Sequence, residues 1–479
     1  MPDEPFAGWI DVPANGIVEE DRNQGLGRGD IARTAPMLMV TAETGGGKSR
    51  KVLAPNIIRW GTQPVVAMSA KGDLAQITIA RRARRGPVYL LDLGGKVSEE
   101  ELRDVPVTRV RVDPCANITN DDQALDMASL LMEVGAIGAG DGGGGGGDAG
   151  FWQSLARRRL ACFLRAGGWY PDPETGEKVW GGGVDWALAA CEDVGPDAAE
   201  DTGGQNVVRE GLDEEAVEDL DDPEVPMDLT TPNWSTAYLR ALAQGSRHSA
   251  SLLAARQMDQ RQRDSIGINC QVALSAWAQE SVATDAVAFE PRMLAERGAT
   301  LYIVSPSSGA AAPAAAITLS QIVDHWLDNF KRLDPVLFVL DEFTNGAPIP
   351  PRRFATWVTM GRGAKIRMCI AVQSTAQFEL IRPAPAVKVM RRTFPSILVM
   401  KGSNEEELLE SAAGWSLPEE RGTAPVGADG RTSHSREQTQ LLTKADLLPR
   451  RGNEGRLLLS GMAGIKVSLD DISHTDADD

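Results

Sequence analysis

The sequence lacks the cysteine and histidine spacing of a metal site or a disulfide framework. Its five cysteines and four histidines are scattered over 479 residues, and no two cysteines form a C-x-x-C pair. We therefore expect buried free thiols, and neither a zinc site nor a disulfide scaffold.

Long apolar runs are also missing. No apolar stretch approaches the roughly 18–20 residues that span a bilayer, and the acidic start MPDEPFAGWIDVP does not have the basic-then-apolar layout of a signal peptide. We expect a cytoplasmic protein that reaches the periphery of the inner membrane through partners and does not insert into it.

The net charge of −18 is distributed unevenly. Residues 195–224 hold twelve acids and one base, a charge of −11, so the rest of the chain carries −7. Such a block is typical of a solvated, disordered insertion. Arginine clusters stand at 81–85, 156–159 and 256–263. The overall charge therefore does not exclude nucleic acid, and 81–85 and 256–263 are either DNA contacts or solvated helix surfaces.

Short apolar runs alternate with helical stretches in the first and last thirds of the chain, whereas the middle third has helical spacing almost throughout. This pattern predicts an α/β fold with a mostly parallel central sheet and an inserted all-α domain. We expect strands at 35–40, 64–70, 87–93, 299–306, 335–343, 365–374 and 396–402, and a closing hairpin within 454–469. The expected domains are 1–117 and 291–470 for the α/β part, 118–290 for the helical insertion and 471–479 for an acidic tail.

A glycine-rich loop, VTAETGGGKSRK (40–51), follows the first apolar run. It fits the Walker A pattern G-x-x-x-x-G-K-[S/T], with Ala42 in place of the first glycine. Backbone N–H groups of such a loop can cradle phosphates, Lys48 would neutralise β/γ-phosphate charge, and Ser49 would ligate Mg²⁺. The predicted nucleotide-binding residues are Thr44, Gly45, Gly46, Gly47, Lys48 and Ser49. The alternative is a glycine turn beside a surface lysine.

A carboxylate pair ends the later apolar run VLFVLDEF. Asp341 is placed to hold the Mg²⁺ shell, and Glu342 to polarise the attacking water, which predicts ATP hydrolysis. Gln373 ends the next predicted strand and would contact the γ-phosphate or the water. Arg362 would reach a neighbouring subunit's nucleotide as an arginine finger if the protein forms rings. Ordinary polar strand ends and a surface arginine are the alternatives for these last two.

Four segments resemble the conjugative coupling ATPases of type IV secretion systems, the TraG/TraD group within the FtsK/HerA-type translocases. They are TAETGGGKSRKVLAPNIIRW, SAKGDLAQITIARRARRGPVYLLDL, DEFTNGAPIPPRRFATWVTMGRGAKIRMCIAVQSTAQFEL and LLTKADLLPRRGNEGRLLLSGMAGIKV. The order DEF…GRG…QS-x-x-Q is the most specific part. Members of this family that are anchored in the membrane begin with transmembrane helices. The family also has an acidic residue before a KGE motif, and that acidic residue is replaced here, where the chain reads Ser69-Ala70-Lys71-Gly72-Asp73.

The resemblance implies a RecA-like P-loop domain with ATP and Mg²⁺ as cofactors and a hexameric ring with a DNA channel. It also implies an all-α domain that recognises a relaxase–DNA complex, and secretion-channel components as further partners. It matches Lys48 and Ser49 to the P-loop, Asp341 and Glu342 to the Walker B pair, Gln373 to the sensor and Arg362 to the finger.

Two other functions remain open from the sequence. One is a packaging or segregation ATPase of a phage or mobile element, which genomic neighbours would distinguish. The other is a nucleotide-regulated adaptor that delivers protein substrates without motor activity, in which the acidic block recruits a basic partner.

Overall fold

The computed structural model describes residues 3–12, 23, 25–102, 104–138, 147–172, 175–195, 229–306, 309–342, 346–375, 394–403, 405–416, 418–423, 435–440, 442–459 and 463–474. Apart from Gly195, the acidic block predicted to be a disordered insertion lies outside these residues, as do 475–479 of the acidic tail.

The chain forms two compact units. The first contains Met1–Val110 and Pro291–Asp479, and the second contains Arg111–Glu290. The second unit is therefore one continuous stretch of chain that interrupts the sequence of the first unit.

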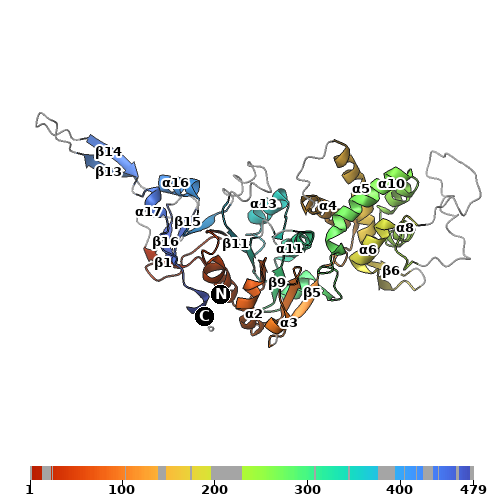
Figure 1. Ribbon diagram of the computed structural model, residues 1–479, viewed down its shortest axis with the longest axis horizontal. Coiled ribbons are helices and arrows are strands. Elements are labelled where there is room, and N and C mark those ends of the chain that lie inside the picture. The colour runs from red at the N-terminus through yellow and green to blue at the C-terminus, as the bar shows by residue number, and fades with distance from the viewer. Residues whose placement is uncertain are drawn as a thin grey trace, which may run out of the picture. The chain divides into compact units, whose positions relative to one another are not determined.

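A mixed sheet forms the centre of the first unit (Figure 1). Its strands are β1 (Trp9–Val12), β2 (Met37–Thr41), β3 (Val65–Ser69), β4 (Val88–Asp92), β5 (Thr108–Arg111), β9 (Thr300–Val304), β10 (Val336–Asp341), β11 (Ile366–Val372), β12 (Ser396–Met400), β15 (Glu454–Leu459) and β16 (Ile465–Ser468). Their order is β1-β16-β15-β12-β2-β11-β10-β3-β9-β4-β5. The run from β12 to β5 is parallel, while β15, β16 and β1 add antiparallel strands at one side.

The parallel strands are buried on both faces. Every residue of β2, β3, β9 and β12 is buried, and so are the first five residues of β10. Near-continuous apolar runs are typical of such strands, since helices cover both sides of a parallel sheet. The predicted α/β class, the parallel sheet and the closing β15–β16 hairpin are confirmed.

The helices of the first unit lie on both faces of the sheet. They are α1 (Ala54–Arg59), α2 (Asp73–Ala83), α3 (Glu99–Leu102), α11 (Ala312–Asn329), α13 (Pro351–Met360), α16 (Glu406–Gly414) and α17 (Lys444–Leu447). Side chains of α1 and α2 share one apolar cluster with alternate residues of the central strands, and Figure 1 shows α11 and α13 on the other side from α2. A separate ribbon consists of β13 (Pro418–Thr423) and β14 (Ser435–Gln440).

A buried arginine joins α2 to the amino ends of two neighbouring strands. Arg82 is 0% exposed, and its guanidinium donates to the carbonyls of Gly61 (2.6 Å), Gln63 (2.9 Å) and Gly298 (3.0 Å) and to the Thr300 hydroxyl (2.7 Å). Burial lowers the pKa of Arg82 to about 10. Carbonyls from both loops, the one that leads into β3 and the one that leads into β9, therefore share one cation as a hydrogen-bond donor.

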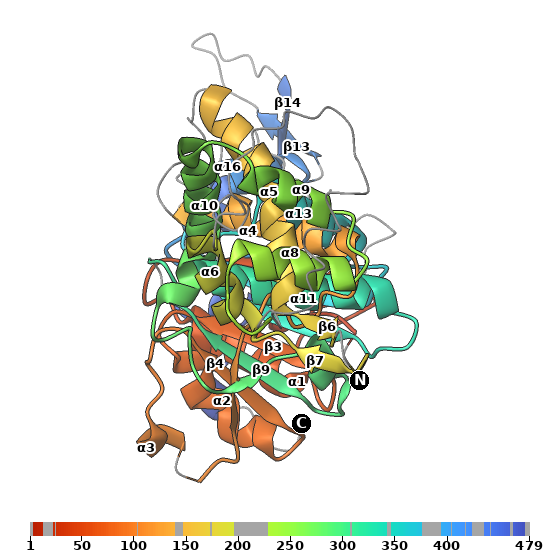
Figure 2. The same cartoon turned by 90° about the vertical axis from the view of Figure 1, so that its right-hand side faces the viewer.

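The second unit is mostly helical. Its elements are α4 (Asp121–Gly138), α5 (Gly147–Gly167), α6 (Gly183–Glu192), α8 (Trp234–Ala243), α9 (Ser249–Arg256), α10 (Gln260–Leu274) and the short strands β6 (Trp169–Pro171), β7 (Lys178–Trp180) and β8 (Val287–Ala288). Helices α4, α5 and α10 pack against one another (Figure 2). Over the described stretches of chain, no helix has the length and apolar character needed to cross a membrane.

Candidate nucleotide-binding site

The glycine loop connects β2 to a π-helical turn, Ser49–Leu53, which leads into α1. Gly45 (φ +78°) and Gly47 (φ +86°) adopt the left-handed region that residues with a Cβ disfavour. A Cβ on Gly46 would lie 3.0 Å from the Glu43 carbonyl oxygen. The turn thus depends on all three glycines, and the loop lines a cavity of about 420 Å³.

Ala42 replaces the first glycine of the pattern without disturbing this loop. Its side chain is fully buried in the apolar cluster under the sheet and does not face the cavity. Its carbonyl accepts a hydrogen bond from Lys48 Nζ at 2.8 Å, and the Glu43 carbonyl accepts a second at 3.1 Å. Burial lowers the pKa of Lys48, against the opposing pull of nearby carboxylates. The loop therefore orients its own lysine.

Ser49 and Asp341 meet across the cavity, as the sequence spacing of a P-loop and a Walker B carboxylate predicts. The Ser49 hydroxyl donates to Asp341 Oδ2 at 3.2 Å, and nothing among the described residues donates to the buried Oδ1. Burial, followed by the charges of Asp73 and Glu342, raises the pKa of Asp341 to about 6. A hydroxyl and a carboxylate with an unpartnered oxygen fit Mg²⁺, which keeps waters and phosphate oxygens as its other ligands.

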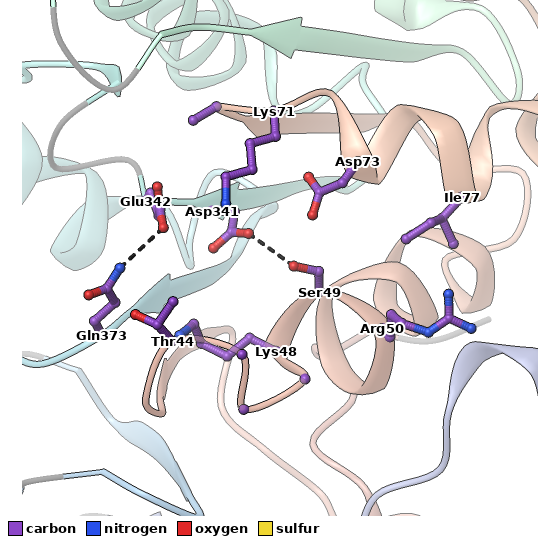
Figure 3. A pocket seen from close by; sticks show the side chains of 14 residues that line it. Thr44, Lys48, Ser49, Arg50, Lys71, Asp73, Ile77, Asp341, Glu342 and Gln373 are labelled. Carbon is purple, nitrogen blue, oxygen red and sulfur yellow. Dashed lines mark hydrogen bonds between the residues drawn. The ribbon is translucent and has the colours of Figure 1, made fainter. Parts of the chain in front are cut away.

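Glu342 and Gln373 form a second pair at one end of the cavity (Figure 3). Gln373 Nε2 donates to Glu342 Oε1 at 3.2 Å. Strands β10 and β11 are parallel neighbours, with Asp341 beside Ala371, so both side chains project from the same edge of the sheet. Glu342 has φ +49°, and a strained residue of this kind marks a position that the surrounding structure fixes. The pair is placed to contact a water molecule beside a bound phosphate.

The sequence prediction missed cavity residues that follow β3. Lys71 and Asp73 line the cavity, and Arg50 and Ile77 lie at its other end (Figure 3). Gly72, with φ +73°, turns the chain from β3 into α2. The sequence signal for these residues is a polar turn between a buried strand and an amphipathic helix. The turn reaches the cavity because β3 pairs directly with β10, the strand that carries Asp341.

Arg362 is not among the described residues that line this cavity. The exposed Arg362 follows α13 and precedes β11, whereas Gln373 follows β11. Seven strand residues separate the two ends of β11 by on the order of 20 Å. Arg362 therefore lies at the opposite edge of the sheet, beside Arg367, which donates to its carbonyl.

The basic clusters are only partly exposed. Neither alternative, DNA contact or solvated helix surface, holds for Arg82, which is buried, and Arg85 points inward to the Ile58 carbonyl. In the cluster at 156–159, the buried Arg159 donates to the carbonyls of Leu155 and Ser251. In the cluster at 256–263, Arg263 donates to the Arg256 carbonyl. Structural hydrogen bonds therefore hold some of these arginines, whereas others, such as Arg84 and Arg261, are exposed.

Comparisons with known proteins agree with this geometry. Residues 11–164 match the family described as type IV secretory system conjugative DNA transfer, and residues 335–450 match the TraM recognition site of TraD and TraG. No curated relative matches the sequence.

The fold is similar to solved structures of a bacterial conjugative coupling protein, TrwB. Its unbound TrwBΔN70 form is 14% identical with a TM-score of 0.54, over 92% of this chain and 87% of that chain. Its complex with a non-hydrolysable GTP analogue is 15% identical with a TM-score of 0.53, over 92% and 88%. At this identity the likeness shows the fold, which is that of a RecA-like P-loop domain with an insertion. The two family matches, which together cover more than half of the chain, place it in the family of conjugative coupling proteins of type IV secretion systems, the TraG/TraD group.

Proposed function

We propose that the protein hydrolyses ATP to move DNA, or a relaxase–DNA complex, into a type IV secretion machine. The observation that carries this proposal is the gathering of Lys48, Ser49, Asp341, Glu342 and Gln373 around one cavity, from segments almost 300 residues apart. Such a set binds phosphate and activates water, which is more than a binding module needs.

Different residues of the cavity bind the phosphates, hold the metal ion and activate the water. The N–H groups of Gly45–Ser49 and the Lys48 ammonium bind the phosphates. Ser49 and Asp341 would hold Mg²⁺, which neutralises charge that develops on the phosphate oxygens. Glu342 accepts a proton from the attacking water, and Gln373 orients that water through its contact with Glu342.

Arg362 acts in this proposal on a second copy of the chain. It lies at the opposite edge of the sheet from Glu342 and cannot reach its own nucleotide. In a homo-oligomeric ring, such as a hexamer, the edge of one subunit that carries Arg362 would face the cavity of the next. Turnover would then depend on assembly, while the helical unit Arg111–Glu290 would recognise the cargo and secretion-channel components would receive it.

The first test measures ATPase rate and particle mass together, with and without DNA. We expect DNA to stimulate the assembled wild type, and Arg362→Ala to lose the stimulated increment while still binding ATP. Arg352→Ala is the matched control, because Arg352 is exposed at the other end of α13. A monomer whose turnover is indifferent to DNA would overturn the motor proposal.

Nucleotide binding with Mg²⁺ should strengthen as the pH rises through about 6. Asp341 must lose its proton to hold the metal ion, and its pKa is raised from 3.8 to about 6. The folded chain therefore binds more protons than the unfolded chain between these values. This group's contribution to stability falls as the pH rises across that window and is constant above it.

Titration of a fluorescent ATP analogue across this pH range, in Mg²⁺ and in EDTA, checks the prediction. The rise in affinity near pH 6 should appear only with Mg²⁺ and should be absent in Asp341→Asn. A Mg²⁺-dependent affinity that does not change with pH would contradict the proposed metal role of Asp341.

A further inference from the structure

The described residues that follow β12, 401–403 and 405, lie beside the nucleotide-binding loop and are called segment 401–405 below. Strand β2 is paired on one side with β12 and on the other with β11, and Thr41 stands in register with both Val399 and Val372. Because these three strands are parallel, the loops that follow them leave the sheet at the same edge. Segment 401–405, the glycine loop and the segment after Gln373 are therefore neighbours.

Two contacts join segment 401–405 to the glycine loop. The hydroxyls of Thr41 and Ser403 share a hydrogen bond, and both residues are buried. Gly402 has φ +79°, and a Cβ there would lie 2.2 Å from Glu43 Cδ. The Glu43 side chain thus occupies the space that any side chain at position 402 would need.

A buried carboxylate joins the same segment to the strand end that carries Gln373. Glu405 is 3% exposed, and it accepts hydrogen bonds from Thr375 N at 2.5 Å and from Thr375 Oγ1 at 2.7 Å. Thr375 follows Gln373 by two residues, and Gln373 donates to Glu342. A carboxylate that accepts two short hydrogen bonds fixes both the backbone and the side chain of its partner.

These contacts form one chain of interactions from the glycine loop to the water-activating pair. We propose that Glu405 is a positioning residue for ATP hydrolysis, which holds Gln373 against Glu342 by fixing Thr375. Segment 401–405 then passes the nucleotide state of the glycine loop to α16, which begins directly after Glu405. The inference rests on the proposed function and adds to it a residue that never touches the nucleotide.

The test compares two variants with a matched control. Glu405→Gln replaces one of the two acceptors by a donor, and Thr375→Val removes Oγ1 but keeps the N–H group. Glu407→Gln makes the same charge change at an exposed position of α16. We expect the first two to lower kcat roughly 10- to 100-fold, because catalytic groups lose rate steeply when displaced by about 1 Å. ATP affinity and the Glu407→Gln rate should stay near wild type.

A double-variant cycle separates positioning from general destabilisation. If Glu405 acts through Gln373, then Glu405→Gln should add no further loss of kcat in a Gln373→Ala background. Losses that multiply would overturn the inference, and so would a Glu405→Gln or Thr375→Val protein with wild-type kcat. Thr375→Val makes the smaller change and decides the question if Glu405→Gln does not fold.

Hydrogen exchange distinguishes failure of this inference from failure of the proposed function. With a non-hydrolysable ATP analogue, wild type should gain protection at the Thr375 amide and in 405–416, and Glu405→Gln should lose this response. If the wild type shows this response but does not hydrolyse ATP, the ATPase proposal is wrong and the coupling between the glycine loop and α16 stands. If the wild type hydrolyses ATP without this response, only the coupling is wrong.

Discussion

Glu342→Gln is expected to lower steady-state ATP hydrolysis by roughly 10²–10⁴-fold, the usual contribution of a general base, while ATP affinity stays within about twofold. The glutamine keeps the shape of the side chain and an oxygen that can accept the hydrogen bond from Gln373, so the cavity should not change form. It cannot take a proton from water. Rate and affinity are measured on the same assembled preparation.

Two comparison variants separate a loss of catalysis from a loss of nucleotide affinity and from a general change in the charge of the cavity. Lys48→Ala should lose affinity, because Lys48 contacts phosphate in the ground state as well as in the transition state. Asp73→Asn removes a carboxylate from the same cavity without touching the Glu342–Gln373 pair, and we expect less than about tenfold change in kcat. Wild-type turnover in Glu342→Gln would contradict the assignment. Negligible turnover in wild type, with unchanged substrate delivery in the variant, would favour the nucleotide-regulated adaptor.

Arg82→Met should destabilise the first unit by on the order of 4 kcal/mol, because removal of the guanidinium leaves several buried acceptors unsatisfied. Methionine fills much of the same space but donates nothing to the carbonyls of Gly61, Gln63 and Gly298. The loss should be visible as a lower urea midpoint and as faster hydrogen exchange at the start of β3 and β9.

Arg84→Met is the control for this substitution. Arg84 is exposed at the end of the same helix, and its replacement should change stability by no more than about 0.5 kcal/mol. Equal effects of the two variants would show that the buried hydrogen bonds of Arg82 contribute nothing beyond side-chain volume.

Local chemistry made the nucleotide-binding loop and the carboxylate pair predictable. Each motif directly follows a buried apolar strand, and parallel strands bring their following loops to one edge whatever their separation in sequence. The placement of Gln373 between the two motifs needed only one further assumption, that β10 and β11 pair, and they do.

The roles of Arg82 and Glu405 could not be predicted in this way, because they depend on tertiary contacts. The run of arginines at 81–85 predicts an exposed basic surface that includes Arg82, although Leu74, Thr78 and Arg82 recur every four residues on the buried face of α2. Helical spacing was thus the available signal, and the neighbouring arginines obscured it. Glu405 carried no signal at all, because its partner Thr375 lies 30 residues away and only the strand order brings them together.

The strand order also bears on synthesis of the chain. Strand β2 pairs with β11 and β12, which leave the ribosome more than 300 residues after it. At 5–20 residues per second, that interval is on the order of 15–65 s. During this time β2 has none of its described sheet partners, and β3 has none until β9 emerges at Thr300. The helices of the second unit can meanwhile pack on one another as they emerge. The nascent polypeptide thus exposes apolar strand segments for tens of seconds, and chaperones that bind extended apolar chain should find sites within the first hundred residues.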